Sequence, residues 1–347
     1  MRILVGMSGG IDSTFAAHRL MSLGHEVAGA VIDMHEYSDI SAARSAADAL
    51  GISLYIINCR KRFEERVVSN FISEYRSGRT PNPCIVCNSE VKFECLLDFA
   101  LENGFDAIAT GHYASVLREG DRYYLRDSRD ARKDQTYMLW RLSQRVLARL
   151  ALPLSDLTKD EVRAEVRRLG LVSLDRPDSQ EICFIPDNDH GAFIKERVGE
   201  LPAGDFVDKD GRVLGRHNGI VNYTVGQRKG LGISLGARAF ISEIDPITNR
   251  ITLSTEVGQS SAFSVRDVVF SGIQPTAFPA EYRLGVKHRY QAERTPATVT
   301  FYENGTAEVR LDTPAKSVTP GQSAVFYLDG ALAAGGFIDS QNLDKRG

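Results

Sequence analysis

A stretch rich in glycine and serine near the start of the chain has the residue types of an anion-binding loop. It follows the apolar run Ile3–Val5 and precedes a predicted helix over Thr14–Met21, so it connects a buried strand to a helix. Glycines let the backbone approach a ligand closely, and the N–H groups of a first helical turn attract negative charge. A phosphate is the expected ligand of this loop, which comprises Gly6, Met7, Ser8, Gly9, Gly10, Ile11, Asp12 and Ser13.

Two well-known phosphate loops do not fit this stretch. A Walker loop requires a Lys-Ser or Lys-Thr pair after its last glycine, and the dinucleotide fingerprint requires a third glycine where this chain has Asp12. An ordinary turn in which Asp12 and Ser13 cap the helix is the plain structural alternative. The pattern Ser-Gly-Gly-x-Asp-Ser on a strand-to-helix turn resembles instead the pyrophosphate loop of enzymes that split ATP between its α and β phosphates.

Thiols provide the second possible chemistry. Cys84 and Cys87 lie in Arg79–Asn88, whose prolines are expected to hold both on a rigid loop before a helix over Ser89–Asn103. Closeness to a helix N-terminus favours a thiolate. Cys183 is a third candidate. A Cys-x-x-Cys pair alone fits a redox pair, half of a zinc site or half of an iron–sulfur site, and no second pair completes a zinc site.

Composition narrows the class of protein. The 347 residues are 43% hydrophobic and 25% charged, which indicates a globular protein of two or three domains. No apolar run approaches the roughly 18 residues of a membrane span and the start lacks signal-peptide features, so we expect a cytoplasmic protein with no membrane partner. Five cysteines argue against a disulfide framework, and Cys59 and Cys95 are expected to be packing thiols. With a net charge of −3, nucleic acid would need a local basic patch.

The first half of the chain alternates predicted strands and helices, which indicates a doubly wound parallel α/β sheet with ligands beyond the carboxyl ends of its strands. Met34 ends one strand and could line an adenine pocket or belong to the core. Gly111 could let a nucleotide approach the backbone or be a plain loop glycine. His112 could contact substrate, or its ring nitrogens could only hydrogen-bond within the protein. The predicted elements are strands over Glu26–Met34, Ser53–Asn58 and Ala107–Thr110 and helices over Ile40–Leu50, Phe63–Tyr75 and Ser89–Asn103.

Short β-branched runs separated by turn residues follow Pro202 and predict two small β-rich modules, the last a β-barrel. Before them, a hairpin is expected over Ser115–Arg126, and Thr158 and Glu161 predict a capped helix start. Basic residues outnumber acids from Arg118 to Arg168, which is either a nucleic-acid surface or a solvated face. We expect domains over residues 1–200, 201–264 and 265–347.

These motifs together resemble the bacterial tRNA-specific 2-thiouridylases over nearly the whole chain. The resemblance implies an adenine-nucleotide α-hydrolase-like domain followed by two β-rich domains. It also implies ATP and Mg²⁺ as cofactors, a sulfur donor protein as partner, and 2-thiolation of the wobble uridine in tRNAs for Lys, Glu and Gln. Besides the first loop, the matching stretches are Thr80–Pro83, Cys87–Asn88, Ala109–Tyr113, Lys133–Gln135, Asp178–Ser179, Ile182–Phe184, Tyr223–Gly232, Arg289–Tyr290 and Thr319–Gln322.

The resemblance also implies roles by position. ATP would adenylate the C2 oxygen of the uridine, and sulfur would then replace AMP. Cys183 would carry that sulfur as a persulfide, with Cys87 as its partner thiol. Gly6–Ser13, Met34 and Gly111 would hold ATP. The anticodon stem-loop of tRNA would meet Asn82, Pro83, Cys84, His112, Lys133, Asp134, Gln135, Arg289, Tyr290 and Gln322.

Cys84 departs from the family pattern, which has an aspartate, a proposed general base, three residues before the first catalytic cysteine. A thiol is a weak substitute for a carboxylate base. Cys84, Cys87 and Cys183 could instead bind three irons of a 4Fe–4S cluster whose fourth iron carries a sulfide. The cluster, the persulfide route with Cys84 as a bystander, and a metal-free redox role for Cys84 and Cys87 all stay open.

Two other functions are weaker. An amidotransferase-type synthetase would need a glutaminase, and the chain has neither an N-terminal cysteine nor a separate domain for one. A tRNA-binding module with a vestigial nucleotide site is disfavoured because Ser8, Gly9, Gly10, Asp12 and Ser13 are all present.

Overall fold

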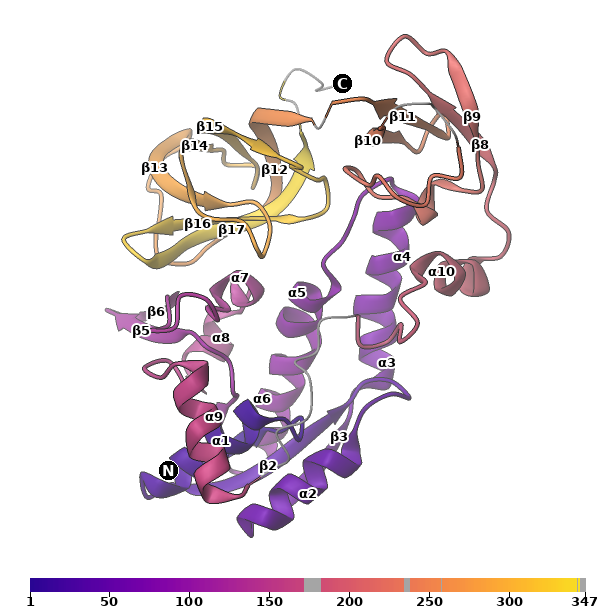
Figure 1. Ribbon diagram of the computed structural model, residues 1–347. Coiled ribbons are helices and arrows are strands. Elements are labelled where there is room, and N and C mark those ends of the chain that lie inside the picture. Colours follow the sequence, from indigo (N-terminus) through magenta and orange to yellow (C-terminus); the bar gives the residue numbers. More distant parts are fainter. Residues whose placement is uncertain (172–181, 234–237, 257, 342, 344–347) are drawn as a thin grey trace. The chain divides into compact units, whose positions relative to one another are not determined.

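The first part of the protein is built on a parallel sheet with helices on both faces (Figure 1). The computed structural model describes residues 1–171, 182–233, 238–256, 258–341 and 343. The elements of this part, with η for π-helical turns, are β1 (Arg2–Gly6), α1 (Ile11–Ser22), β2 (Glu26–Asp33), α2 (Ile40–Leu50), β3 (Leu54–Asn58), α3 (Arg60–Phe63), η1 (Glu64–Val68), α5 (Pro83–Cys87), η2 (Asn88–Lys92), α6 (Phe93–Glu102), β4 (Ala107–Ala109), β5 (Ser115–Glu119), β6 (Arg122–Arg126), α7 (Thr136–Leu139), α8 (Gln144–Leu147), β7 (Leu150–Ala151) and α9 (Lys159–Leu169).

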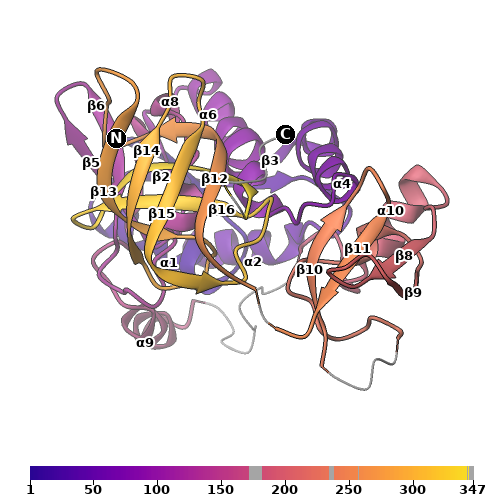
Figure 2. The same cartoon turned by 90° about the horizontal axis from the view of Figure 1, so that it is seen from above.

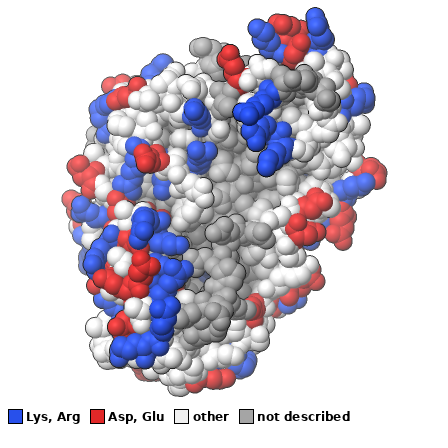
Figure 3. Space-filling model, viewed as in Figure 1, with Lys and Arg blue, Asp and Glu red and all other residues white. Residues whose placement is uncertain are grey.

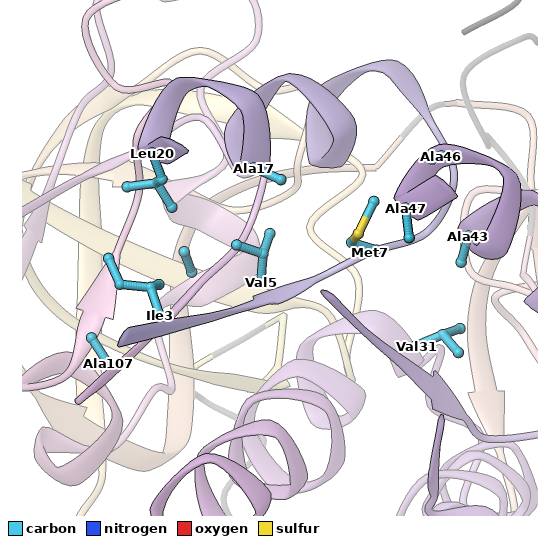
Figure 4. Close-up of a cluster of buried hydrophobic side chains, with 11 residues drawn as sticks. Ile3, Val5, Met7, Ala17, Leu20, Val31, Ala43, Ala46, Ala47 and Ala107 are labelled. Atoms are coloured by element: carbon cyan, nitrogen blue, oxygen red, sulfur yellow. The ribbon is translucent and has the colours of Figure 1, made fainter. Parts of the chain in front are cut away.

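The sheet has the strand order β3-β2-β1-β4-β7, and every neighbouring pair runs parallel. Alternate residues of β1 serve opposite faces. Ile3 and Val5, with Met7 just beyond the strand, share a buried cluster with α1 and α2 (Figure 4). On the other face, a Cβ atom at Gly6 would lie 3.3 Å from Leu96 of α6. The predicted doubly wound architecture is confirmed.

Local signals explain most element boundaries. Asp39 caps α2 by accepting a hydrogen bond from the N–H of Ala42, and the helix spans the predicted residues. Thr158 and Glu161 form the predicted capping box of α9. The predicted helix over Phe63–Tyr75 was wrong in detail, because helical structure begins at Arg60 and contains the π-helical turn η1.

The chain folds into two compact units. The first comprises Met1–Val67, Cys84–Phe184 and Asp329–Ala333, and the second comprises Val68–Pro83, Ile185–Leu328 and Ala334–Gly347. Apart from the first residues of β17, the second unit contains α4 (Ser69–Arg76), α10 (His190–Val198), β8 (Gly204–Val207), β9 (Val213–His217), a 3₁₀ turn η3 (Ile220–Asn222), β10 (Phe240–Asp245), β11 (Arg250–Ser254), β12 (Gln259–Phe270), β13 (Ala280–Lys287), β14 (Thr295–Phe301), β15 (Ala307–Lys316), β16 (Ser323–Leu328) and β17 (Ala331–Ser340).

The second unit confirms the two β-rich modules. One is a four-stranded sheet in the order β10-β11-β8-β9. The other is a six-stranded barrel in the order β12-β15-β14-β13-β16-β17, which closes because β12 also pairs with β17 (Figure 2). Closure leaves these strands without a free edge. Among the described residues, no helix is both long and apolar enough to cross a membrane.

The segment Val68–Pro83 packs within the second unit. Tyr75 of α4 stacks on His190, with ring centroids 4.6 Å apart. The Glu74 carboxylate is buried, accepts two hydrogen bonds of 2.8 Å from Arg79 and receives a third, of 2.9 Å, from Arg266 of β12. A buried carboxylate with this many charged donors is well satisfied, so these contacts fix the chain that leads to α5.

Candidate active site

The loop Gly6–Ser13 is ordered by its own hydroxyl groups. It leaves β1 and enters α1, whose N-cap is Gly10 in an extended conformation. The hydroxyls of Ser8 and Ser13 lie 3.2 Å apart, and the N–H of Ser8 donates to Oγ of Ser13 at 3.2 Å. No side chain caps α1, so the alternative in which Asp12 and Ser13 cap the helix is wrong. Uncapped N–H groups at a helix start suit a phosphate.

Two glycines permit close backbone contacts around this loop. Gly9 has a φ of 74°, and a Cβ atom there would lie 2.4 Å from the backbone of Ala42. A Cβ atom at Gly111, which follows β4, would lie 2.6 Å from the backbone carbon of Asp12 and 2.7 Å from the nitrogen of Ser13. A side chain at either position would displace the loop. Position 111 therefore needs glycine for steric reasons.

Lys159 belongs to this site although sequence reasoning placed it only in the basic run. Its ammonium donates to Oδ2 of Asp12 at 2.6 Å, while the hydroxyl of Tyr113 donates to Oδ1 at 2.9 Å. Lys159 is only 4% exposed. Asp12 is therefore held on both oxygens beside the loop. The capping box that begins α9 was visible in the sequence, but nothing there indicated a partner 147 residues away.

The candidate thiols lie in the same unit as the loop. Cys84 and Cys87 are on the short helix α5, which begins at Pro83 and continues into η2. The expected rigid loop was thus wrong, because proline is well suited to the first position of a helix. Cys183 is exposed, like Cys84, whereas Cys87 is 5% exposed and its Sγ lies 3.5 Å from Sδ of Met34. Met34 therefore lies directly after β2 and next to a candidate cysteine.

Burial changes the chemistry expected of Cys87. It raises the pKa of the Cys87 thiol to about 12, and the charges of Cys183 and Cys84 act in the same direction. Although Cys183 is exposed as a residue, desolvation of its thiol by the surrounding protein raises its pKa, and the charge of Cys84 acts in the same direction. The expected thiolate at Cys87 is therefore disfavoured in the free protein, because the thiol is desolvated and Cys87 is the last residue of α5 instead of lying at a helix start.

The candidate thiols and their described neighbours are not arranged as a set of metal ligands. Within the described ranges, no three or more His, Cys, Asp or Glu side chains are arranged to hold an ion. Cys84, Cys87 and Cys183 are thus not arranged as a cluster site in this structure. Asp178 and Ser179 lie outside the described residues. Cys59 and Cys95 are buried and hydrogen-bond each other, which fits packing thiols.

His112 is held as a neutral imidazole. Its Nδ1 lies 2.9 Å from Oγ1 of Thr110, and its ring lies against Phe93. Burial lowers the pKa of His112 to about 3, and the charge of Lys92 lowers it further. A neutral imidazole can hydrogen-bond a base edge but supplies no charge to a phosphate.

The lowered pKa of the half-buried His112 imidazole predicts a pH effect on stability. The folded pKa of about 3 lies below the ordinary value of 6.5, so the stability from this residue is present above pH 6.5 and lost as the pH falls toward 3. The loss is at most about 1.4 kcal/mol per pH unit. Melting temperatures of wild type and His112→Asn should therefore converge between pH 6.5 and 4. A constant difference across this range would contradict the assignment.

Other candidate tRNA residues of the first unit shape their own loop. Asp134 is buried. Its carboxylate accepts one hydrogen bond from the N–H of Ser128 at 3.0 Å and another from the N–H of Thr136 at 3.2 Å. Gln135 accepts a hydrogen bond from the N–H of Tyr113 at 2.9 Å. Lys133 is half-buried beside them. The amide and carboxylate are engaged with the protein, so they hold the chain that carries Lys133.

The remaining candidates lie in the second unit. Arg289 is exposed and Tyr290 half-buried after β13, with the Lys287 ammonium 5.4 Å from the Tyr290 ring. Gln322 donates its side-chain amide to the carbonyl of Thr80 at 2.9 Å. Two residues beyond Thr80, Asn82 is half-buried, and Pro83 is buried. Gln322 therefore holds the segment before α5.

The basic run is largely neutralised. Arg129 pairs with Glu161, Arg132 and Arg163 with Asp160, Arg141 with Glu90, Arg145 with Glu94 and Asp98, and Arg168 with Glu165. Figure 3 shows lysine and arginine side chains interspersed with acidic ones over the region of α9 and the β5–β6 hairpin. The basic run from Arg118 to Arg168 is therefore mostly a solvated face on which the arginines form ion pairs.

Comparisons with known proteins agree with this arrangement. Family models match a tRNA methyl transferase HUP domain over residues 1–187, a tRNA methyl transferase PRC-barrel domain over 191–255 and an aminomethyltransferase beta-barrel domain over 260–338. The loop between β1 and α1 is thus part of a HUP domain of the pyrophosphate-loop type, and it fits ATP.

Full-length relatives define the family more closely. The tRNA-specific 2-thiouridylase MnmA of Acetivibrio thermocellus is 43% identical over 97% of this chain and 98% of its own. Those of Clostridium kluyveri and Carboxydothermus hydrogenoformans are 41% and 42% identical, each over 98% of this chain and 99% and 98% of their own. The chain belongs to the tRNA-specific 2-thiouridylase family.

Proposed function

We propose that this protein is a tRNA-uridine 2-sulfurtransferase that uses ATP to replace the C2 oxygen of the wobble uridine in tRNAs for Lys, Glu and Gln. The observation that carries this proposal is the 43% identity over 97% of the chain to a protein named for that activity. The anion loop and the thiols of Cys87 and Cys183 in one compact unit support it. A tRNA substrate puts the reaction in the cytoplasm.

In the first step, the C2 oxygen attacks the α-phosphorus of ATP, and pyrophosphate leaves. Gly6–Ser13, Met34 and Gly111 hold the nucleotide, with Lys159 and Tyr113 fixing Asp12. Magnesium would accompany ATP and would offset the negative charge of its phosphates, while Asp12 stays held by Lys159 and Tyr113. The adenylated oxygen becomes a good leaving group, as AMP.

In the second step, sulfur moves through the two cysteines. A donor protein's persulfide passes its outer sulfur to Cys183 and is left with a thiol. The outer sulfur of the Cys183 persulfide attacks C2, and AMP leaves with the C2–O bond electrons. The Cys87 thiolate then attacks Sγ of Cys183, which forms a disulfide and releases C2=S on the base. A thiol reductant restores both cysteines.

The tRNA contacts divide between two kinds of residue. His112, Arg289 and Tyr290 offer hydrogen bonding, charge and stacking to an unstacked loop base and its backbone. Asn82, Pro83, Cys84 and Lys133 would meet the tRNA directly. Asp134, Gln135 and Gln322 act in this proposal by holding the chain around those contacts. The three domains are proposed to span residues 1–200, 201–264 and 265–347.

Release of AMP from ATP tests the adenylation step. Unmodified tRNA is expected to stimulate AMP release by the wild-type protein. Asp12→Asn should lower this release by about 10²-fold, because it alters the loop's charge and weakens the contact to Lys159. Lys61→Met, a change at a side chain 90% exposed, is the matched surface control. Undiminished release by Asp12→Asn would overturn the proposed step.

A further inference from the structure

A half-buried lysine next to the candidate thiols has no role in the reaction described so far. Lys92 is the last residue of the π-helical turn η2, which follows Cys87 directly. Hydrogen bonds in a π-helix join residues five apart, so a residue and the fifth after it lie on the same side. Cys87 and Lys92 are such a pair. In a regular α-helix, Val91 would be nearer that position.

The charge of Lys92 reaches several groups of the candidate site. It is a source of positive potential at Cys87, Cys183, His112 and His35. The other charges acting on Cys87 come from the thiols of Cys84, Cys95 and Cys183, all of which oppose an anion there. For Cys183, Cys84 is the opposing group. Among the described residues, Lys92 is thus a cation that acts on both thiols.

No carboxylate neutralises Lys92 within the described part of the chain. The acids on either side of it are engaged elsewhere: Glu90 with Arg141 at 2.8 Å and Glu94 with Arg145 at 2.7 Å. An unpaired ammonium that is half-buried is costly unless it serves an anion. The sulfur-transfer steps create such anions at Cys183 and at Cys87.

We infer that Lys92 is a positioning residue for sulfur transfer, supplying the positive charge that stabilises the persulfide anion on Cys183 and the attacking thiolate of Cys87. The inference rests on the proposed roles of these cysteines. Desolvation and the neighbouring thiols disfavour sulfur anions at both positions. A nearby ammonium offsets that effect without becoming bonded to either sulfur, and the electrons move as described for the persulfide route.

The test compares Lys92→Met and Lys92→Gln, which remove the charge, with Lys92→Arg, which keeps it. Alkylation of Cys183 by iodoacetamide is followed against pH by mass spectrometry of the cysteine peptide. Loss of the charge should move the midpoint up by about 1 unit and lower the rate at pH 7 about tenfold. Thiolation should fall similarly at pH 7 and recover at higher pH, while AMP release is unchanged. Lys92→Arg should restore both.

Lys61→Met is the control for loss of a lysine charge elsewhere on the first unit. The inference is overturned if Lys92→Met and Lys92→Gln keep the wild-type alkylation profile, or if they thiolate tRNA normally at pH 7. Failure of the proposed function gives a different result: Cys183→Ser or Cys87→Ser would still thiolate tRNA, whatever the alkylation profiles show.

Discussion

Replacing Cys183 by serine is expected to lower tRNA thiolation by about 10³-fold or more while leaving tRNA-stimulated AMP release intact. A serine hydroxyl cannot accept persulfide sulfur, whereas the loop proposed to bind ATP does not depend on this side chain. The measurement combines incorporation of labelled sulfur into tRNA with release of AMP from the same reaction. Parallel loss of both activities would contradict a role confined to sulfur transfer.

Cys84→Ser, compared with Cys183→Ser, distinguishes the persulfide route from an iron–sulfur cluster. Both cysteines are exposed, but the persulfide route needs only Cys183 and Cys87. We therefore expect Cys84→Ser to retain most thiolation and the protein purified without oxygen to lack iron. About four irons per chain, lost together with thiolation in Cys84→Ser, would replace the persulfide route with a cluster.

Gly111→Ala is expected to abolish most ATP use, by about 10²-fold in AMP release. The added methyl group would lie 2.6 Å from the Asp12 backbone, so the loop Gly6–Ser13 must move away from β4. A small backbone displacement at this loop would misplace the N–H groups that are proposed to bind phosphate. AMP release and the melting temperature are measured together, since overpacking also costs about 1–3 kcal/mol of stability.

Gly258→Ala is the matched control, because a Cβ atom there would meet nothing within 4 Å. It should leave AMP release and melting temperature unchanged. Normal AMP release by Gly111→Ala would mean that the loop tolerates displacement and that its contact with Gly111 does not position ATP.

Elements with strong local signals could be predicted from the sequence. The alternating apolar runs predicted β2 and β3 to within a residue, and the bounds of α2 followed from its helical periodicity, with Gly51 just beyond its end. The loop before α1 was visible because its glycines, serines and aspartate are contiguous. Sequence reasoning therefore located the features that depend on residues close together in the sequence.

Long-range contacts could not be predicted in this way. Lys159 looked like a surface residue at a helix start, and only the folded chain brings its ammonium to Asp12. Burial of Cys87 depends on the packing around α5, so its raised pKa opposed the local expectation from the helix start. The π-helical turn η2, which puts Lys92 on the same side as Cys87, also lacks a distinctive residue pattern.

The assignment of Val68–Pro83 to the second unit limits how this protein can be divided. Glu74 takes a donor from Arg266, and the Thr80 backbone bonds to Pro320 and Gln322, although chain from the first unit both precedes and follows this segment. A gene fragment that ended after Phe184 would remove one donor, Arg266, from the Glu74 carboxylate and both partners of the Thr80 backbone, immediately ahead of the cysteine helix. The regions matched by the three family models therefore cannot be exchanged independently of one another. We expect the three to be inherited, lost or recombined together.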